Sequence, residues 1–129
     1  MNDFKHKEIT NGIIKAFYKV YNTLGYGFLE KVYENALFHE LQVAGYFVVK
    51  QHPIKVHYQE LQVGDYYADL IVEDKVIVEI KAAGGLAEEH EFQLINYLKA
   101  TDKEVGLLLN FGKKPQFKRK VFTNVIERR

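Results

Sequence analysis

Residues 69–81 read DLIVEDKVIVEIK and form the most strand-like stretch of the chain. Apolar, mostly β-branched residues fill it, and the polar residues 73–75 divide it into two strands joined by a turn, which predicts a β-hairpin. Three charged residues do not fit this pattern: Asp69, Glu79 and Lys81. Charged side chains are rarely buried unless they are paired or hold a metal ion. We therefore ask which of these two conditions the hairpin meets.

The register of the hairpin decides whether the two carboxylates meet. Side chains alternate along a strand, so Glu79 and Lys81 share one face. A three-residue loop pairs Val72 with Val76 and places Asp69 directly across from Glu79, with their Cβ atoms about 4.5–5.5 Å apart. A two-residue loop would shift the register by one and break this match.

Two carboxylates so close to each other repel unless a positive charge lies between them. A hard divalent cation such as Mg²⁺ prefers oxygen ligands of this kind. Lys81, on the same face, would then stand beside the metal-bound water and a scissile phosphate. The alternative is an ion pair of Lys81 with Asp69 or Glu79 and no metal.

The rest of the chain predicts helices before and after the hairpin, because apolar residues recur at spacings of three and four and glycines follow two of these segments. The expected helices span about residues 4–24, 29–43 and 88–100. The expected strands span about 46–58, 62–72, 75–81 and 105–111, with an extra edge strand over 117–126. Pro53 favours an edge position or a bulge for the first strand. This order predicts a mixed α/β sheet with helices packed on it.

Two pairs of residues on the expected helices could extend the site. Gln93 and Tyr97 are four apart and lie on one helix face, which a crossover over the sheet can direct towards the hairpin. Glu30 and Tyr33 are three apart on an otherwise apolar face, where a carboxylate needs a partner. The plainer interpretations are a surface glutamine beside a core-edge tyrosine, and a Glu30 that stabilises the first turn of its helix.

Composition excludes several classes of protein. The chain contains 0 cysteines and no serine, which excludes disulfides, thiolate zinc sites and a serine nucleophile. Its five histidines lack a zinc-binding spacing. No apolar run approaches the roughly 18 residues of a membrane span, and the first residues lack a signal-peptide core. The 129 residues suit one domain over 1–129, and we expect it in the cytoplasm without a membrane partner.

The net charge of +1 favours no partner, but basic residues gather at the C-terminal end. Residues 113–129 hold seven lysines and arginines against one acid, Glu127. Such a segment can contact phosphate backbones, or it can simply be solvated.

Asp69, followed on the next strand by Glu79-Ile80-Lys81, resembles the signature of the PD-(D/E)XK nuclease superfamily. The expected order of elements resembles its restriction-endonuclease-like αβββαβ core. One departure is Ala68, which stands where that signature often has proline. The resemblance implies an α/β (α+β) fold with a mixed central sheet flanked by helices.

Two further motifs carry the same resemblance. Gln93-x-x-x-Tyr97 resembles the motif on the following helix in the RecB-like branch of the superfamily. Gly27-x-x-Glu30-x-x-Tyr33 is similar to the naming signature of the small GxxExxY proteins. Together the motifs cover about residues 10 to 112.

The resemblance implies a role for each matching residue. The metal ligands would be Asp69, Glu79, the Ile80 carbonyl and Glu30, holding Mg²⁺ or Mn²⁺. Lys81 would be catalytic, and the substrate-binding residues would be Gln93, Tyr97 and Tyr33. The expected activity is metal-dependent phosphodiester cleavage of DNA, with RNA and a homodimer left open. The alternative is a non-catalytic module that keeps the nuclease fold and binds nucleic acid or protein.

Overall fold

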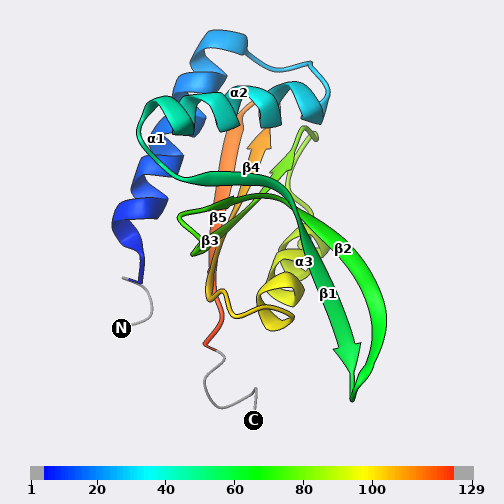
Figure 1. Cartoon of the computed structure of the whole chain (residues 1–129). Helices are drawn as coiled ribbons and strands as arrows, with labels where there is room; N and C mark the ends of the chain where they lie inside the picture. Colours follow the sequence, from blue (N-terminus) through cyan, green and yellow to red (C-terminus); the bar gives the residue numbers. More distant parts are fainter. Residues whose placement is uncertain (1–4, 124–129) are drawn as a thin grey trace.

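The computed structural model describes residues 5–123, which contain three helices and five strands (Figure 1). The helices are α1 (Lys7–Leu24), α2 (Glu30–Val43) and α3 (Glu88–Lys99). The strands are β1 (Val48–Tyr58), β2 (Leu61–Val72), β3 (Val76–Lys81), β4 (Val105–Phe111) and β5 (Pro115–Val121). The order predicted from the sequence is confirmed. Half of the element ends agree with the prediction, and the others differ by one to three residues except the end of the last strand, which lies at Val121 and not at 126.

The five strands form one mixed sheet in the order β1-β2-β3-β4-β5. Neighbouring strands are antiparallel except β3 and β4, which are parallel because α3 carries the chain back across the sheet between them. Helices α1 and α2 cover one face of the sheet and α3 covers the other (Figure 1). The predicted fold class, a mixed central sheet flanked by helices, is confirmed.

Each face of the sheet has its own apolar core. Residues such as Leu70 and Leu107 pack with α1 and α2, whereas Ile77 and Leu108 pack with α3. Strand β4 is buried along its whole length, which explains why its sequence is apolar except for Asn110. A Cβ at Gly106 would lie 2.6 Å from the Leu94 side chain. The glycine thus lets α3 approach β4 closely.

The turn between β2 and β3 has a three-residue loop, one of the two lengths that the sequence left open. Val72 pairs with Val76 and Leu70 with Val78. Glu73 and Asp74 in the loop both have a φ of 56°, in the left-handed region. The same register, continued by one pair, sets Asp69 opposite Glu79.

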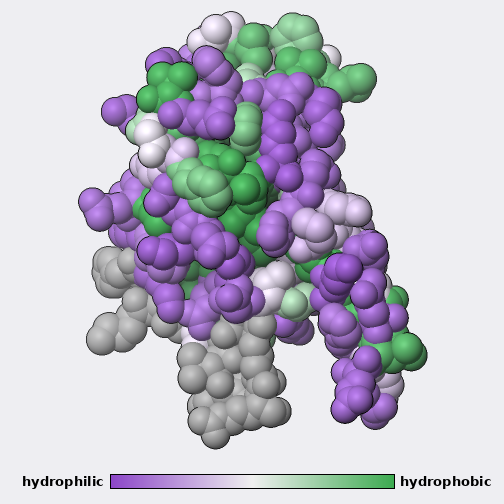
Figure 2. Space-filling view, viewed as in Figure 1, coloured by the Kyte–Doolittle hydropathy of each residue, from purple (hydrophilic) through white to green (hydrophobic). Residues whose placement is uncertain are grey.

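Strands β1 and β2 extend beyond the rest of the sheet as a hairpin arm, here defined as residues 52–68. Figure 1 shows the arm projecting past α3, and in Figure 2 its tip stands apart from the body of the molecule. Strand β1 lies at the edge of the sheet, and Pro53 pairs with Tyr67. The edge position predicted from the proline is therefore confirmed.

Strand β5 forms the opposite edge and begins the basic C-terminal segment. Residues 124–126 of the expected last strand, and Arg128 and Arg129 of the basic segment, lie outside the described residues. Over residues 5–123, no helix is both long enough and apolar enough to cross a membrane.

Candidate active site

Asp69 and Glu79 lie side by side between β2 and β3, and each binds the backbone of the other strand. The Asp69 N–H donates to Glu79 Oε2 at 2.9 Å, and the Ile80 N–H donates to Asp69 Oδ2 at 2.8 Å. The regular ladder of the two strands ends at Leu70 and Val78, one pair earlier. Side-chain carboxylates therefore replace backbone carbonyls as the acceptors here, which fixes both carboxylates in position.

The surroundings of these carboxylates disfavour their charged forms. Burial, together with the adjacent Asp69 carboxylate, raises the pKa of Glu79 to about 8. Burial also raises the pKa of Asp69, although the hydrogen bond from the Ile80 N–H opposes this. Such a pair holds a proton at neutral pH unless a cation takes its place.

Lys81 follows one position beyond Ile80 and reaches towards α3. Its Nζ lies 3.5 Å from Gln93 Oε1. The charge of Lys81 lowers the pKa of both Asp69 and Glu79, yet no ion pair joins it to either carboxylate within the described part of the chain. The structural salt bridge considered from the sequence is therefore absent.

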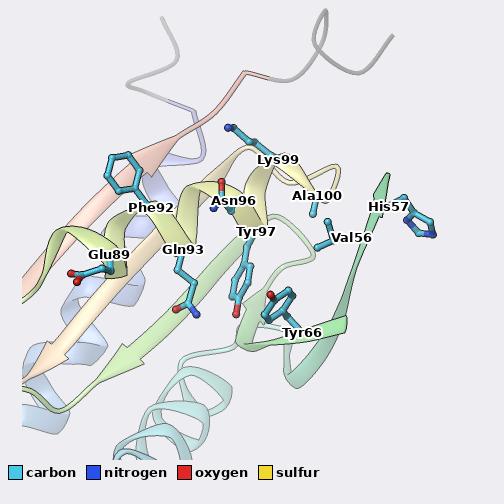
Figure 3. A pocket seen from close by; sticks show the side chains of 10 residues that line it. All are labelled: Val56, His57, Tyr66, Glu89, Phe92, Gln93, Asn96, Tyr97, Lys99 and Ala100. Atoms are coloured by element: carbon cyan, nitrogen blue, oxygen red, sulfur yellow. The ribbon is translucent and has the colours of Figure 1, made fainter. Parts of the chain in front are cut away.

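Tyr97 comes from the same face of α3 as Gln93. It is only 6% exposed, and its ring lies 5.7 Å from the ring of Tyr66 on β2. Burial raises the pKa of Tyr97 to about 12, and the charges of Glu79 and Asp69 act in the same direction. The hydroxyl therefore stays protonated at neutral pH and can donate a hydrogen bond. Figure 3 shows Gln93 and Tyr97 pointing to one side of α3.

A third carboxylate, Glu34 of α2, lies near the pair and was missed by the sequence analysis. It is 4% exposed, and its charge raises the pKa of Asp69 and Glu79. Gln51 connects it to the pair, since its Nε2 lies 3.0 Å from Glu34 Oε1 and 3.4 Å from Asp69 Oδ1. Lys31 binds the other oxygen, Oε2, at 3.2 Å.

Two residues expected at the site, Glu30 and Tyr33, lie in other surroundings than the sequence suggested. Glu30, expected as a further metal ligand, is the first residue of α2 and is exposed. The carboxylate that α2 directs towards the pair is Glu34, one helical turn later. The sequence carried a signal for this, because Glu34 shares the buried face of α2 with Leu37 and Leu41.

Tyr33, expected to bind substrate, instead stabilises the connection between α1 and α2. It is 0% exposed, and its ring stacks on Phe111 at 4.3 Å. Its hydroxyl donates to the Gly25 carbonyl at 2.8 Å and accepts from the Phe28 N–H at 3.2 Å. Gly27 in this connection has a φ of 111°, which glycine adopts without strain. Gly27 and Tyr33 of the Gly27-x-x-Glu30-x-x-Tyr33 motif therefore stabilise the loop between α1 and α2.

Residues 7–120 match the family described as the PD-(D/E)XK nuclease superfamily. The chain belongs to the PD-(D/E)XK nuclease superfamily. No curated protein matches it. A solved structure, described as the crystal structure of SSO0001, is 15% identical to the chain with a TM-score of 0.47. That match covers 67% of this chain and 52% of the other, so the chain spans about half the length of that protein.

Nucleases of the PD-(D/E)XK superfamily generally use divalent metals and act on nucleic acids. The donor chemistry found here fits such a metal, because the buried carboxylate of Glu79 and the half-buried carboxylate of Asp69 share one site with no ion pair to Lys81. Within residues 5–123, no three His, Cys, Asp or Glu side chains form a complete metal cluster. Mg²⁺ needs only one or two carboxylates when waters and phosphate oxygens complete its coordination.

Proposed function

We propose that this chain is a metal-dependent phosphodiesterase that cuts DNA. Asp69, Glu79 and the backbone carbonyl of Ile80 would hold the divalent cation, Mg²⁺ or Mn²⁺. The observation that supports this proposal is the position of the two carboxylates across adjacent strands, each fixed by a backbone N–H of the other strand. When bound, such a cation lowers the pKa of a water molecule and neutralises charge on the phosphate.

Lys81 supplies the positive charge that the reaction needs. Since it is not paired with Asp69 or Glu79, its ammonium can donate to a phosphate oxygen and stabilise the negative charge that develops in the transition state. Gln93 lies near enough to orient the ammonium. Tyr97 adds a neutral hydroxyl donor, because its pKa lies near 12.

Glu34 supports the site without being one of the proposed metal ligands. It accepts a hydrogen bond from Gln51, which also reaches Asp69. Glu34 and Gln51 therefore position Asp69, and the negative charge of Glu34 adds to the attraction of the site for a cation.

The experiment that tests this function is cleavage of labelled single-stranded, double-stranded and branched DNA, with Mg²⁺, Mn²⁺ or EDTA. We expect cutting by the wild type only with metal, and a loss of at least about a hundredfold in Lys81→Ala, in line with the removal of one transition-state donor. Lys15→Ala, which removes an exposed lysine of α1, is the matched control and should cut normally. The same assay with RNA of the same sequence shows whether cleavage depends on the sugar of the substrate.

Two results would contradict the proposal. The first is cutting that persists in EDTA or in Lys81→Ala. The second is no cutting by the wild type with either metal, which would favour the alternative of a non-catalytic module on the nuclease fold. Binding of the same DNA would then be measured to identify what that module recognises.

A further inference from the structure

A cavity of about 650 Å³ opens beside the candidate active site, between α3 and the hairpin arm (Figure 3). Gln93 and Tyr97 belong to both places: they line the cavity, and they lie next to Lys81 and the carboxylate pair. The cavity and the candidate active site therefore share Gln93 and Tyr97 as neighbours. Its size falls within the range of about 300–1,000 Å³ that is usual for ligand pockets.

The cavity wall combines aromatic rings with side-chain amides. Tyr66 on β2 and Tyr97 on α3 pack against each other in the cavity wall, with ring centres 5.7 Å apart and ring planes tilted by 45° (Figure 3). Tyr66 is 49% exposed, so much of its ring is available to a ligand. Asn96 and Gln93 contribute amides from α3, and each amide offers both hydrogen-bond donors and an acceptor. Rings for stacking and amides for base edges are the groups that proteins use to bind unpaired bases.

Two lysines lie near the cavity and suit a polynucleotide. Lys81 does not line the cavity but lies beside Gln93, which does. Lys99 lines the cavity further along α3, and its Nζ lies 6.0 Å from the centre of the Phe122 ring. Within residues 5–123, Glu89 is the one carboxylate that lines the cavity. Ammonium groups of this kind can contact the backbone phosphates that flank a bound base.

We propose that this cavity binds one unpaired nucleobase of the nucleic acid whose backbone lies at the carboxylate pair. The inference rests on the proposed function and specifies its substrate class: a single strand, or a nucleotide unpaired next to the cleavage point. A base within a duplex is covered on both faces by its neighbours and cannot stack on Tyr66 without leaving the helix, which costs free energy.

The arm provides a control residue for Tyr66. Tyr67 is the next residue on β2, so its side chain points to the opposite face, and it is 51% exposed. Tyr67 does not line the cavity. Replacement of either tyrosine removes the same group from the same strand, but only one replacement changes the cavity.

The test measures binding of fluorescent oligonucleotides by anisotropy, in EDTA so that nothing is cut. The probes are single-stranded DNA, single-stranded RNA and a blunt DNA duplex of the same sequence. We expect the wild type to prefer a single strand. Tyr66→Ala should weaken that binding by between about fivefold and a hundredfold, the range found when a base loses its aromatic partner. Asn96→Ala should weaken it as well, while Tyr66→Phe and Tyr67→Ala should bind as the wild type does.

The proposal is overturned if Tyr66→Ala binds normally, if Tyr67→Ala loses as much affinity as Tyr66→Ala, or if the wild type binds the duplex as well as the single strand. The DNA and RNA probes distinguish the two sources of an unpaired base. A chain that binds single strands through Tyr66 but never cuts would refute the phosphodiesterase and leave the cavity assignment standing. A chain that cuts duplexes and binds nucleic acid equally well with Tyr66→Ala would refute the cavity assignment and leave the phosphodiesterase standing.

Discussion

Replacement of Glu79 by glutamine should make the metal-free protein more stable at neutral and alkaline pH. The side chain is 5% exposed, and its Oε2 accepts a hydrogen bond from the Asp69 N–H. Glutamine has nearly the same shape and keeps a carbonyl oxygen for this bond. The substitution therefore removes little besides the ability to ionise.

The size of the effect follows from the pKa of Glu79, which is about 8 in the folded chain against 4.5 for an unperturbed glutamate. Because the folded pKa is raised, the folded chain binds the proton more tightly, and this contribution to stability is complete below about pH 4.5. It is lost as the pH rises towards 8, at about 1.4 kcal/mol for each pH unit. The wild type should thus lose about 3 kcal/mol by pH 7 through this group.

Urea unfolding in EDTA at pH 5, 7 and 8.5 measures this loss. Glu79→Gln should lie within about 1 kcal/mol of the wild type at pH 5 and exceed its free energy of unfolding by about 3 kcal/mol or more above pH 7. Glu60→Gln, at an exposed position in the β1–β2 turn, should follow the wild type throughout. A difference between Glu79→Gln and the wild type that stays constant from pH 5 to 8.5 would refute this account of the site.

Three further predictions concern the same site and its support. Glu34→Gln should weaken the binding of Mn²⁺ and slow cutting by about tenfold or more, as expected for a residue that positions a metal ligand. Glu30→Gln should change neither. A Mn²⁺ titration and a cleavage assay measure both variants, and equal losses in the two would show that Glu34 has no greater part in the site than Glu30. Mn²⁺ affinity of the wild type, measured by calorimetry, should rise from pH 6 to 8 with release of protons, and a flat profile would show that the carboxylates are already charged. Tyr33→Phe should cost about 1–3 kcal/mol in thermal unfolding, since the Gly25 carbonyl loses its donor, and should leave nucleic-acid affinity unchanged.

The hairpin and its facing carboxylates could be predicted from the sequence because they depend on the position of one turn and on the alternation of side chains along a strand. The polar residues 73–75 mark the turn, and with a three-residue loop the alternation of strand side chains places Asp69 opposite Glu79. The position of Gln93 and Tyr97 near Lys81 also followed, since a helix that connects two parallel strands must cross the sheet. These inferences depend only on local spacing.

The role of α2 could not be predicted in the same way. Glu30 and Glu34 are one turn apart, so both satisfy the same helical spacing. The choice between them depends on where α2 begins and how it packs against β1. Gln51, which connects Glu34 to Asp69, has a φ of 49°, and no glycine marks this irregularity in the sequence. The cavity beside the arm is likewise a product of packing between α3 and β2.

The hairpin arm also has a consequence for how this fold can change its reach. Its turn lies far from both apolar cores, and its two strands pair mainly with each other. Adding two residues to each strand would lengthen the arm by about 7 Å and keep every side chain on its own face, because strand periodicity is two. Adding one residue to each strand would place the side chains beyond the insertion on the opposite face of the arm. Insertions of two residues in each strand can thus lengthen the arm in steps without moving the carboxylates at its base.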